Sequence, residues 1–185
     1  MPHRVCPWWV GYFLASPLRR LVHSPATILR PFISEGMTVV EPGPGMGFFT
    51  MELARLVGRR GRVVAIDVQP KMLAELRRRA GEAGLLDRID TRQGAGDVMG
   101  LDDLKGQVDF VLAFAVVHEL PSAERFFAEV STVLKSGCRI LLAEPHFQVS
   151  EQEFAATLQM ADKYGFRVDS LPAIRWTRSA DLVKV

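Results

Sequence analysis

The sequence predicts an α/β fold in which helices cover both faces of a mostly parallel sheet. Short apolar runs alternate with helical segments from residue 37 to residue 144, an order that is typical of parallel strands joined by helices. A glycine-rich loop follows the first apolar run, and a carboxylate ends the second run about 20 residues later. The chain has 185 residues, 48% of them hydrophobic and 24% charged, which suits one globular domain.

The elements are expected in a regular order along the chain. The apolar runs predict strands at 37–41, 62–67, 88–93, 108–114 and 138–144. The segments between them predict helices at 48–57, 70–83 and 122–134. A further helix over 151–164 is expected to end at Gly165 and to precede two extended segments, 166–171 and 174–184.

The loop after the first strand has glycines at alternate positions, Gly43, Gly45 and Gly47, and a carboxylate, Glu41, just before them. Glycine lets the backbone turn sharply and lets a ligand approach main-chain atoms that a Cβ would shield. The dinucleotide fingerprint G-x-G-x-x-G would need a glycine where this chain has Phe48, so the spacing disfavours NAD.

Several motifs together resemble the class I S-adenosylmethionine (SAM)-dependent methyltransferases. Their acidic glycine loop is similar to Glu41-Pro42-Gly43-Pro44-Gly45-Met46-Gly47, and their second-strand acid to Asp67. Their adenine loop is similar to Gly94-Ala95-Gly96-Asp97 with Leu101, and the turn before their fifth strand to Leu134-Lys135-Ser136-Gly137-Cys138. The resemblance covers residues 25–185. It implies a Rossmann-like doubly wound domain with a seven-stranded sheet, completed by a C-terminal antiparallel hairpin.

The resemblance also implies how SAM is held. Ligands of such sheets bind outside the carboxyl ends of the strands, where a helix N-terminus suits the carboxylate of SAM and a protein carboxylate suits its ammonium. Asp67 would bind the ribose hydroxyls and Asp97 the adenine amino group. The implied cofactor-binding residues are Glu41, Gly43, Gly45, Gly47, Asp67, Val68, Asp97, Val98 and Phe114.

Purely structural roles, without a ligand, stay open for these residues. Glu41 could be a strand-end acid without a ligand, and Asp67 could be the N-cap of the helix that starts near Pro70. Three glycines between residues 94 and 100 let the alignment of Asp97 slide. Met72 could pack on adenine or belong to the core.

The residues after the fourth strand bear on the acceptor. They read Val116-Val117-His118-Glu119-Leu120-Pro121, without the N/D-P-P-Y/F/W signature of adenine and glutamine-amide methylation. His118 and Glu119 are the catalytic candidates, since a histidine can take up a proton at neutral pH. Both could instead open the next helix or form hydrogen bonds with the neighbouring loop. Glu144 and His146, which close the fifth strand, are candidates for contacting the acceptor.

Residues 1–24 precede the region of resemblance and are interpreted as an N-terminal helical lid over the acceptor pocket, with 25–185 as the methyltransferase domain. Cys6, Trp8 and Trp9 are its candidate substrate contacts. The same aromatic residues could instead form a homodimer interface. His3 and Cys6 fall short of a recognisable metal pattern, so no metal site is predicted.

The predicted function is methyl transfer from SAM to a small-molecule acceptor by in-line displacement. The alternatives are an inactive SAM-binding module or a methyltransferase that acts on protein or RNA. A net charge of +2 does not favour a nucleic-acid partner. Two distant cysteines suit a reducing cytoplasm, and nothing approaches the length of a membrane span.

Overall fold

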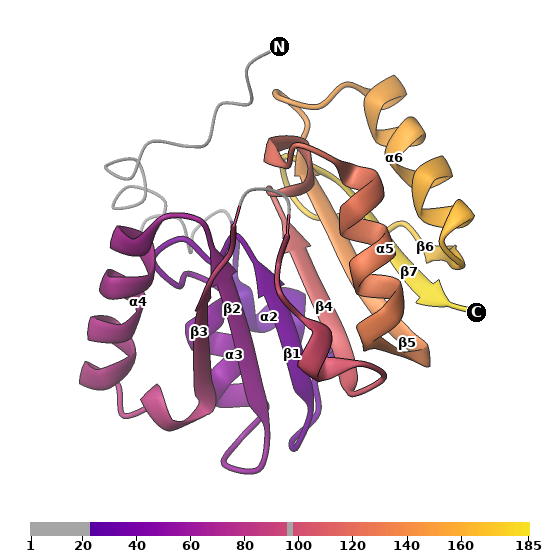
Figure 1. Cartoon of the computed structure of the whole chain (residues 1–185). Coiled ribbons are helices and arrows are strands. Elements are labelled where there is room, and N and C mark those ends of the chain that lie inside the picture. The colour runs from indigo at the N-terminus through magenta and orange to yellow at the C-terminus, as the bar shows by residue number, and fades with distance from the viewer. Residues whose placement is uncertain (1–22, 96–97) are drawn as a thin grey trace. The chain divides into compact units, whose positions relative to one another are not determined.

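The computed structural model describes residues 23–95 and 98–185 and resolves them into two compact units, of which the first ends at Gly94 and the second begins at Ala95. The strand order is β3-β2-β1-β4-β5-β7-β6. Five strands belong to the alternating βα pattern, and the last two pair antiparallel (Figure 1). The predicted α/β fold with a mostly parallel seven-stranded sheet and a C-terminal hairpin is therefore confirmed.

The first unit contains a parallel sheet. Its strands are β1 (Thr38–Pro42), β2 (Arg62–Asp67) and β3 (Ile89–Gln93). Its helices are α2 (Pro25–Leu29), α3 (Thr50–Leu56), α4 (Pro70–Glu82) and the 3₁₀ turn η2 (Leu86–Arg88). The central residues of β1 and β2 are fully buried, as expected for parallel strands that are covered on both faces. The pairing of Glu41 with Ala65 and of Pro42 with Ile66 sets the ends of β1 and β2 in register.

Helix α4 follows from its sequence pattern. Proline opens its first turn, where a missing N–H costs nothing. Its buried face consists of Met72, Leu73, Leu76 and Ala80, so Met72 belongs to this apolar stripe. On the exposed face Arg78 forms ion pairs with Glu75 and Glu82, as expected for a solvated position.

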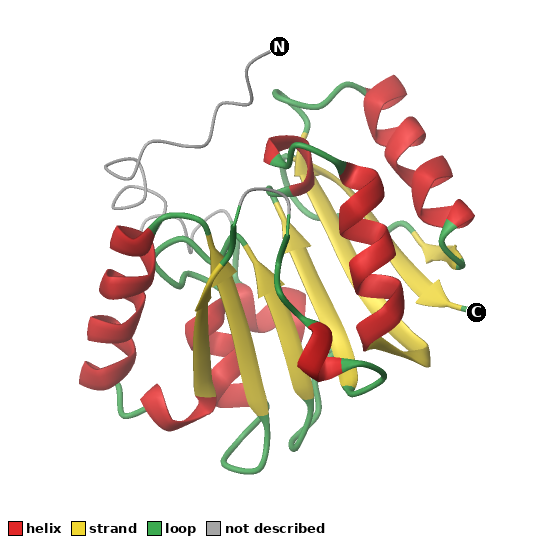
Figure 2. Cartoon of the chain, in the orientation of Figure 1, coloured by secondary structure: helices red, strands yellow, loops and turns green. Residues whose placement is uncertain are grey.

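The second unit contains strands β4 (Val108–Phe114), β5 (Leu134–Pro145), β6 (Phe166–Ser170) and β7 (Thr177–Lys184). Its helices are α5 (Ala123–Val133) and α6 (Glu151–Lys163), with the 3₁₀ turns η3 (Asp102–Leu104) and η4 (Val117–Glu119) (Figure 2). Strand β5 pairs parallel with β4 and antiparallel with β7. Ser122 caps α5, and Ser150 with Glu153 forms a capping box that starts α6.

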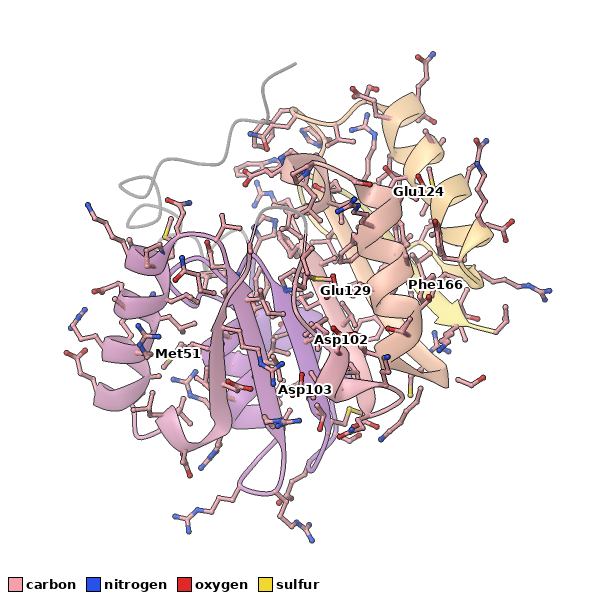
Figure 3. The ribbon with its side chains drawn as sticks, in the orientation of Figure 1. Met51, Asp102, Asp103, Glu124, Glu129 and Phe166 are labelled. Atoms are coloured by element: carbon pink, nitrogen blue, oxygen red, sulfur yellow. The ribbon has the colours of Figure 1, made fainter. Side chains whose placement is uncertain are left out.

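The core of the second unit includes aromatic contacts between elements that are distant in sequence. Phe166, labelled at the start of β6 in Figure 3, has its ring centroid 5.9 Å from that of Phe127 on α5. Both side chains are almost completely buried. Burying such large apolar groups contributes roughly 2 kcal/mol each to stability.

Some element bounds differ from the prediction. Strand β5 begins at Leu134 instead of residue 138, so the expected turn at 134–138 lies within the strand. The pairing with β4 slips there, from Val108 with Leu134 to Phe110 with Arg139, and Gly137 takes a φ of 76°. A bulge of this kind accommodates residues that a regular ladder cannot pair. Helix α2 was not predicted.

Candidate active site

The glycine loop between β1 and α3 turns through backbone conformations that favour glycine. The φ angles of Gly43, Gly45 and Gly47 are 65°, 55° and 85°, a region where a side chain costs roughly 1–2 kcal/mol. The Gly43 N–H donates to the carbonyl of Ile66 at 2.8 Å, which ties the loop to the end of β2. An ideal Cβ on Gly45 would meet no atom within 4 Å, so the backbone has open space on that side.

Gly47 is required for a different reason. A Cβ at this position would lie 2.4 Å from Cδ1 of Leu76, a buried residue of α4. The glycine therefore permits close packing of the loop against the helix, in addition to its positive φ.

The variant Gly47→Ala is expected to lower the free energy of unfolding by about 2 kcal/mol or more, from backbone strain and overpacking against Leu76. Urea-induced unfolding followed by circular dichroism measures this change. Gly36→Ala is the matched control, because its φ of 89° carries the same backbone strain while a Cβ there meets nothing within 4 Å. Equal stability of the two variants would contradict the packing argument.

Two carboxylates of the first unit belong to the strand ends beside the loop. Glu41 is 4% exposed in β1, and Asp67, at the end of β2, is 9% exposed. Asp67 Oδ1 accepts the N–H of Gln69 at 2.8 Å. Burial raises the pKa of Asp67, while hydrogen bonds from the backbone N–H groups of Gln69, Gly45 and Val68 oppose that rise. The N-cap of α4 is Gln69, so Asp67 does not occupy the N-cap position.

One further residue holds the glycine loop. Arg79 of α4 donates from its guanidinium to the carbonyl of Met46 at 2.5 Å, 33 positions away in sequence. The three consecutive arginines at 77–79 look alike in the sequence, so nothing there singles out Arg79 for the contact with the loop. The other two have different partners, because Arg77 bonds Thr91 and Arg78 bonds Glu75 and Glu82.

In the second unit the end of β4 is strained. Phe114 is buried, and Ala115 after it has a φ of 56°. The Ala115 N–H donates to the carbonyl of Ala143 in β5 at 2.7 Å, which helps to hold this conformation. A non-glycine residue in the left-handed region is typical of positions where the backbone is constrained by function.

His118 and Glu144 form a hydrogen-bonded pair. Glu144 Oε1 accepts the N–H of Val117 at 2.8 Å, and Glu144 Oε2 bonds Nδ1 of His118. The topology explains this, because Phe114 pairs with Ala143, so the residues that follow β4 lie beside the last residues of β5. The Glu144 side chain is 2% exposed, whereas that of His118 keeps 19% of its surface exposed.

Several groups act on the pKa of His118. Burial alone lowers it, but the hydrogen bond and charge of Glu144 raise it, together with the charge of Glu119 and a hydrogen bond with Gln148. The net effect places the pKa of His118 above its ordinary value. A histidine with a raised pKa is a stronger base, and it is available as a base only when the pH exceeds that pKa.

The other predicted site residues are placed as follows. His146 is exposed, with its N–H donating to the carbonyl of Trp176 and its ring edge-on to Phe147. Val68 and Val98 are exposed at 39% and 49%.

Asp97, Cys6, Trp8 and Trp9 lie outside the described residues, as does the proposed N-terminal lid up to residue 22. Among the described residues no three His, Cys, Asp or Glu side chains gather in a way that could hold a metal ion.

Glu129 was not predicted from the sequence. Its carboxylate, labelled on α5 in Figure 3, accepts the N–H groups of Met99 and Leu101 at 3.0 and 3.1 Å. The two bonds fix the backbone between the bridge formed by Ala95 and Val98 and the turn η3. The sequence pattern of α5 carried no signal for this role, because the helix also contains Glu124, an acid whose side chain is exposed.

Comparison with known proteins adds to this geometry. A sequence model of the methyltransferase domain family matches residues 40–142. The ubiquinone/menaquinone biosynthesis C-methyltransferase UbiE of Marinomonas sp. (strain MWYL1) is 27% identical over 148 residues, which are 80% of this chain and 56% of that protein. UbiE of Brucella canis is 26% identical, over 75% of this chain and 49% of that protein. The chain thus spans about half the length of these curated relatives.

Solved structures share the fold. A SAM-dependent methyltransferase from Aquifex aeolicus superimposes with a TM-score of 0.86 at 26% identity, covering 98% of this chain and 100% of that one. A protein from Methanococcus maripaludis, described as a SAM-dependent methyltransferase candidate, has a TM-score of 0.79 at 16% identity, with coverage of 100% and 97%. Within the part of the chain that the structure describes, no helix has the length and apolar character needed to cross a membrane.

Proposed function

The chain belongs to the methyltransferase domain family, and on this premise we propose that it transfers a methyl group from SAM to a small-molecule acceptor. When bound, SAM supplies a methyl group on a positively charged sulfur that leaves readily in a direct displacement. The protein then needs mainly to position the acceptor and exclude water, because alignment alone can lower such a barrier by several kcal/mol.

The observation that carries the proposal is the arrangement at the end of β1 and β2. The backbone around Gly45 is open to a ligand, and the buried carboxylates of Glu41 and Asp67 belong to the strand ends beside that loop. These groups fit SAM chemically, since Glu41 can pair with an ammonium and Asp67 can accept hydrogen bonds from ribose hydroxyls. Gly43 and Gly47 would shape the loop, and Val68, Phe114, Asp97 and Val98 would complete the adenosine and methionine contacts.

On the acceptor side, we assign His118 as the group that receives a proton and Glu119 as a charge that supports it. A small-molecule acceptor is supported by the relatives, which are named as C-methyltransferases of ubiquinone and menaquinone biosynthesis. Residues 1–24, with Cys6, Trp8 and Trp9, remain our proposed lid, and His146 a proposed acceptor contact. A cytoplasmic location is supported by the low cysteine content.

The alternatives predict different behaviour. An inactive SAM-binding module would bind SAM without releasing S-adenosylhomocysteine in the presence of any acceptor. A methyltransferase acting on RNA or protein would be favoured by a basic surface, which a net charge of +2 does not support. A paired His118 and Glu144 favours an active enzyme, since binding alone requires no such group.

SAM and S-adenosylhomocysteine are expected to bind and to raise the melting temperature, while NAD has neither effect. A ligand at 100 times its dissociation constant stabilises the folded state by about 2.7 kcal/mol. Isothermal titration calorimetry and thermal unfolding measure both effects. Binding of NAD without binding of SAM would overturn the proposed cofactor.

A further inference from the structure

The pairing of His118 with Glu144 goes beyond a general assignment of His118 as a base, because it specifies which nitrogen accepts the proton. Val117 contributes a backbone N–H, which can only donate, and this N–H lies 2.8 Å from Glu144 Oε1. The other oxygen, Oε2, is left to His118 Nδ1. Each oxygen of a carboxylate accepts hydrogen bonds, so both contacts are satisfied only if Nδ1 carries a proton.

We propose that Glu144 is a positioning residue that holds neutral His118 with its proton on Nδ1, leaving Nε2 to accept a proton from a hydroxyl or thiol of the acceptor. The inference rests on the proposed methyl transfer and extends it to the class of acceptor. The acceptor must carry a proton that it loses on reaction. Acceptors without one, such as tertiary amines and thioethers, would gain nothing from this arrangement.

The reaction balances as follows. The acceptor O–H or S–H bond breaks, its proton passes to His118 Nε2, and the electron pair stays on the acceptor atom. That atom forms its bond to the methyl carbon while the carbon–sulfur bond breaks with its electron pair remaining on sulfur. The products are the methylated acceptor, S-adenosylhomocysteine and a His118 imidazolium, whose positive charge is stabilised by the Glu144 carboxylate.

The burial of Glu144 argues against a direct contact with the acceptor. Its side chain is 2% exposed and both its oxygens have partners within the unit, whereas the His118 side chain is 19% exposed. An ionised carboxylate this deeply buried is costly unless its charge is used by a partner. The charges and polar groups that face His118 are Glu144 on β5, Glu119 within η4 and Gln148 after β5. The side-chain amide of Gln148 can donate its N–H to an unprotonated Nε2, and the hydroxyl or thiol of the acceptor would take its place there.

The amide variant Glu144→Gln separates positioning from packing. Its side chain has nearly the same shape, but only one of its two terminal atoms accepts a hydrogen bond. Because the Val117 N–H must be accepted by that oxygen, the amide nitrogen faces His118 and donates to Nδ1. Neutral His118 must then carry its proton on Nε2, where it can no longer accept one.

The test uses side-chain nitrogen NMR of the full chain labelled at histidine, with the His118 signals assigned by their loss in His118→Asn. In the wild type above the pKa of His118, we expect a protonated Nδ1 and an unprotonated Nε2. In Glu144→Gln we expect the reverse and a lower pKa for His118. The exposed acid variant Glu151→Gln should resemble the wild type. A neutral His118 with its proton on Nε2 in the wild type would overturn the inference.

The second measurement is enzymatic activity, followed as the release of S-adenosylhomocysteine with a panel of phenols, thiols, tertiary amines and thioethers. Glu144→Gln should lower kcat on protic acceptors by about 100-fold or more, with an unchanged dissociation constant for SAM. Transfer only to acceptors without a proton, or full activity of Glu144→Gln, would overturn the inference. Absence of SAM binding in the wild type would instead refute the proposed function, and the NMR result would stand separately.

Discussion

Replacing His118 with alanine is expected to lower kcat by about 10²- to 10⁴-fold on a hydroxyl or thiol acceptor, the usual contribution of a positioned base. The dissociation constant for SAM should stay the same, because His118 bonds Glu144 and Gln148 and has no part in the glycine loop. Single-turnover assays with saturating SAM measure the first quantity, and calorimetric titration measures the second.

The pH dependence of wild-type kcat provides a further check on His118. Its pKa is raised above the ordinary value, so the imidazolium is retained to a higher pH than in a free histidine. Since only the neutral ring accepts a proton, kcat should rise with pH through that raised pKa. This rise should be absent in His118→Ala. A variant that loses SAM binding but retains turnover at saturating SAM would show that His118 serves the cofactor.

Replacing Asp67 with alanine is expected to weaken SAM binding by about 1–3 kcal/mol, which corresponds to a dissociation constant raised roughly 5- to 150-fold. Asp67 ends β2 with its carboxylate buried and bonded to the backbone of Gln69, so it is held in place before any ligand arrives. Calorimetric titration of SAM measures the change, and thermal unfolding without ligand shows whether the variant has kept its fold.

A matched acid in the same unit controls this experiment. Asp87 in η2 has 67% of its side chain exposed, and Asp87→Ala should leave SAM affinity unchanged. The affinity of the wild type should also fall as the pH falls through the raised pKa of Asp67, because only the carboxylate accepts hydrogen bonds from both ribose hydroxyls. Unchanged affinity in a folded Asp67→Ala would remove Asp67 from the ribose site.

The features that the sequence by itself determined are local. The alternation of strands and helices, the turning glycines at 43, 45 and 47, and the acid that ends β2 each depend on residues a few positions apart. The predicted strand bounds at 62–67 and 108–114 agree with the structure. Both strands are marked by runs of hydrophobic and β-branched residues, a signal that depends only on neighbouring positions in the sequence. The cofactor was implied by the resemblance of these local motifs to those of the SAM-dependent methyltransferases.

Tertiary structure alone decided the features that depend on distant partners. Glu144 lies 26 positions from His118, and the parallel pairing of β4 with β5 brings the two together. Arg79 reaches the glycine loop across 33 positions, and Glu129 reaches Met99 across 30. A buried polar group requires a partner, but its sequence does not say which one, because the choice depends on strand register and on the packing of helices. The start of β5 at Leu134 was missed for the same reason, since its pairing with Val108 is a contact between strands.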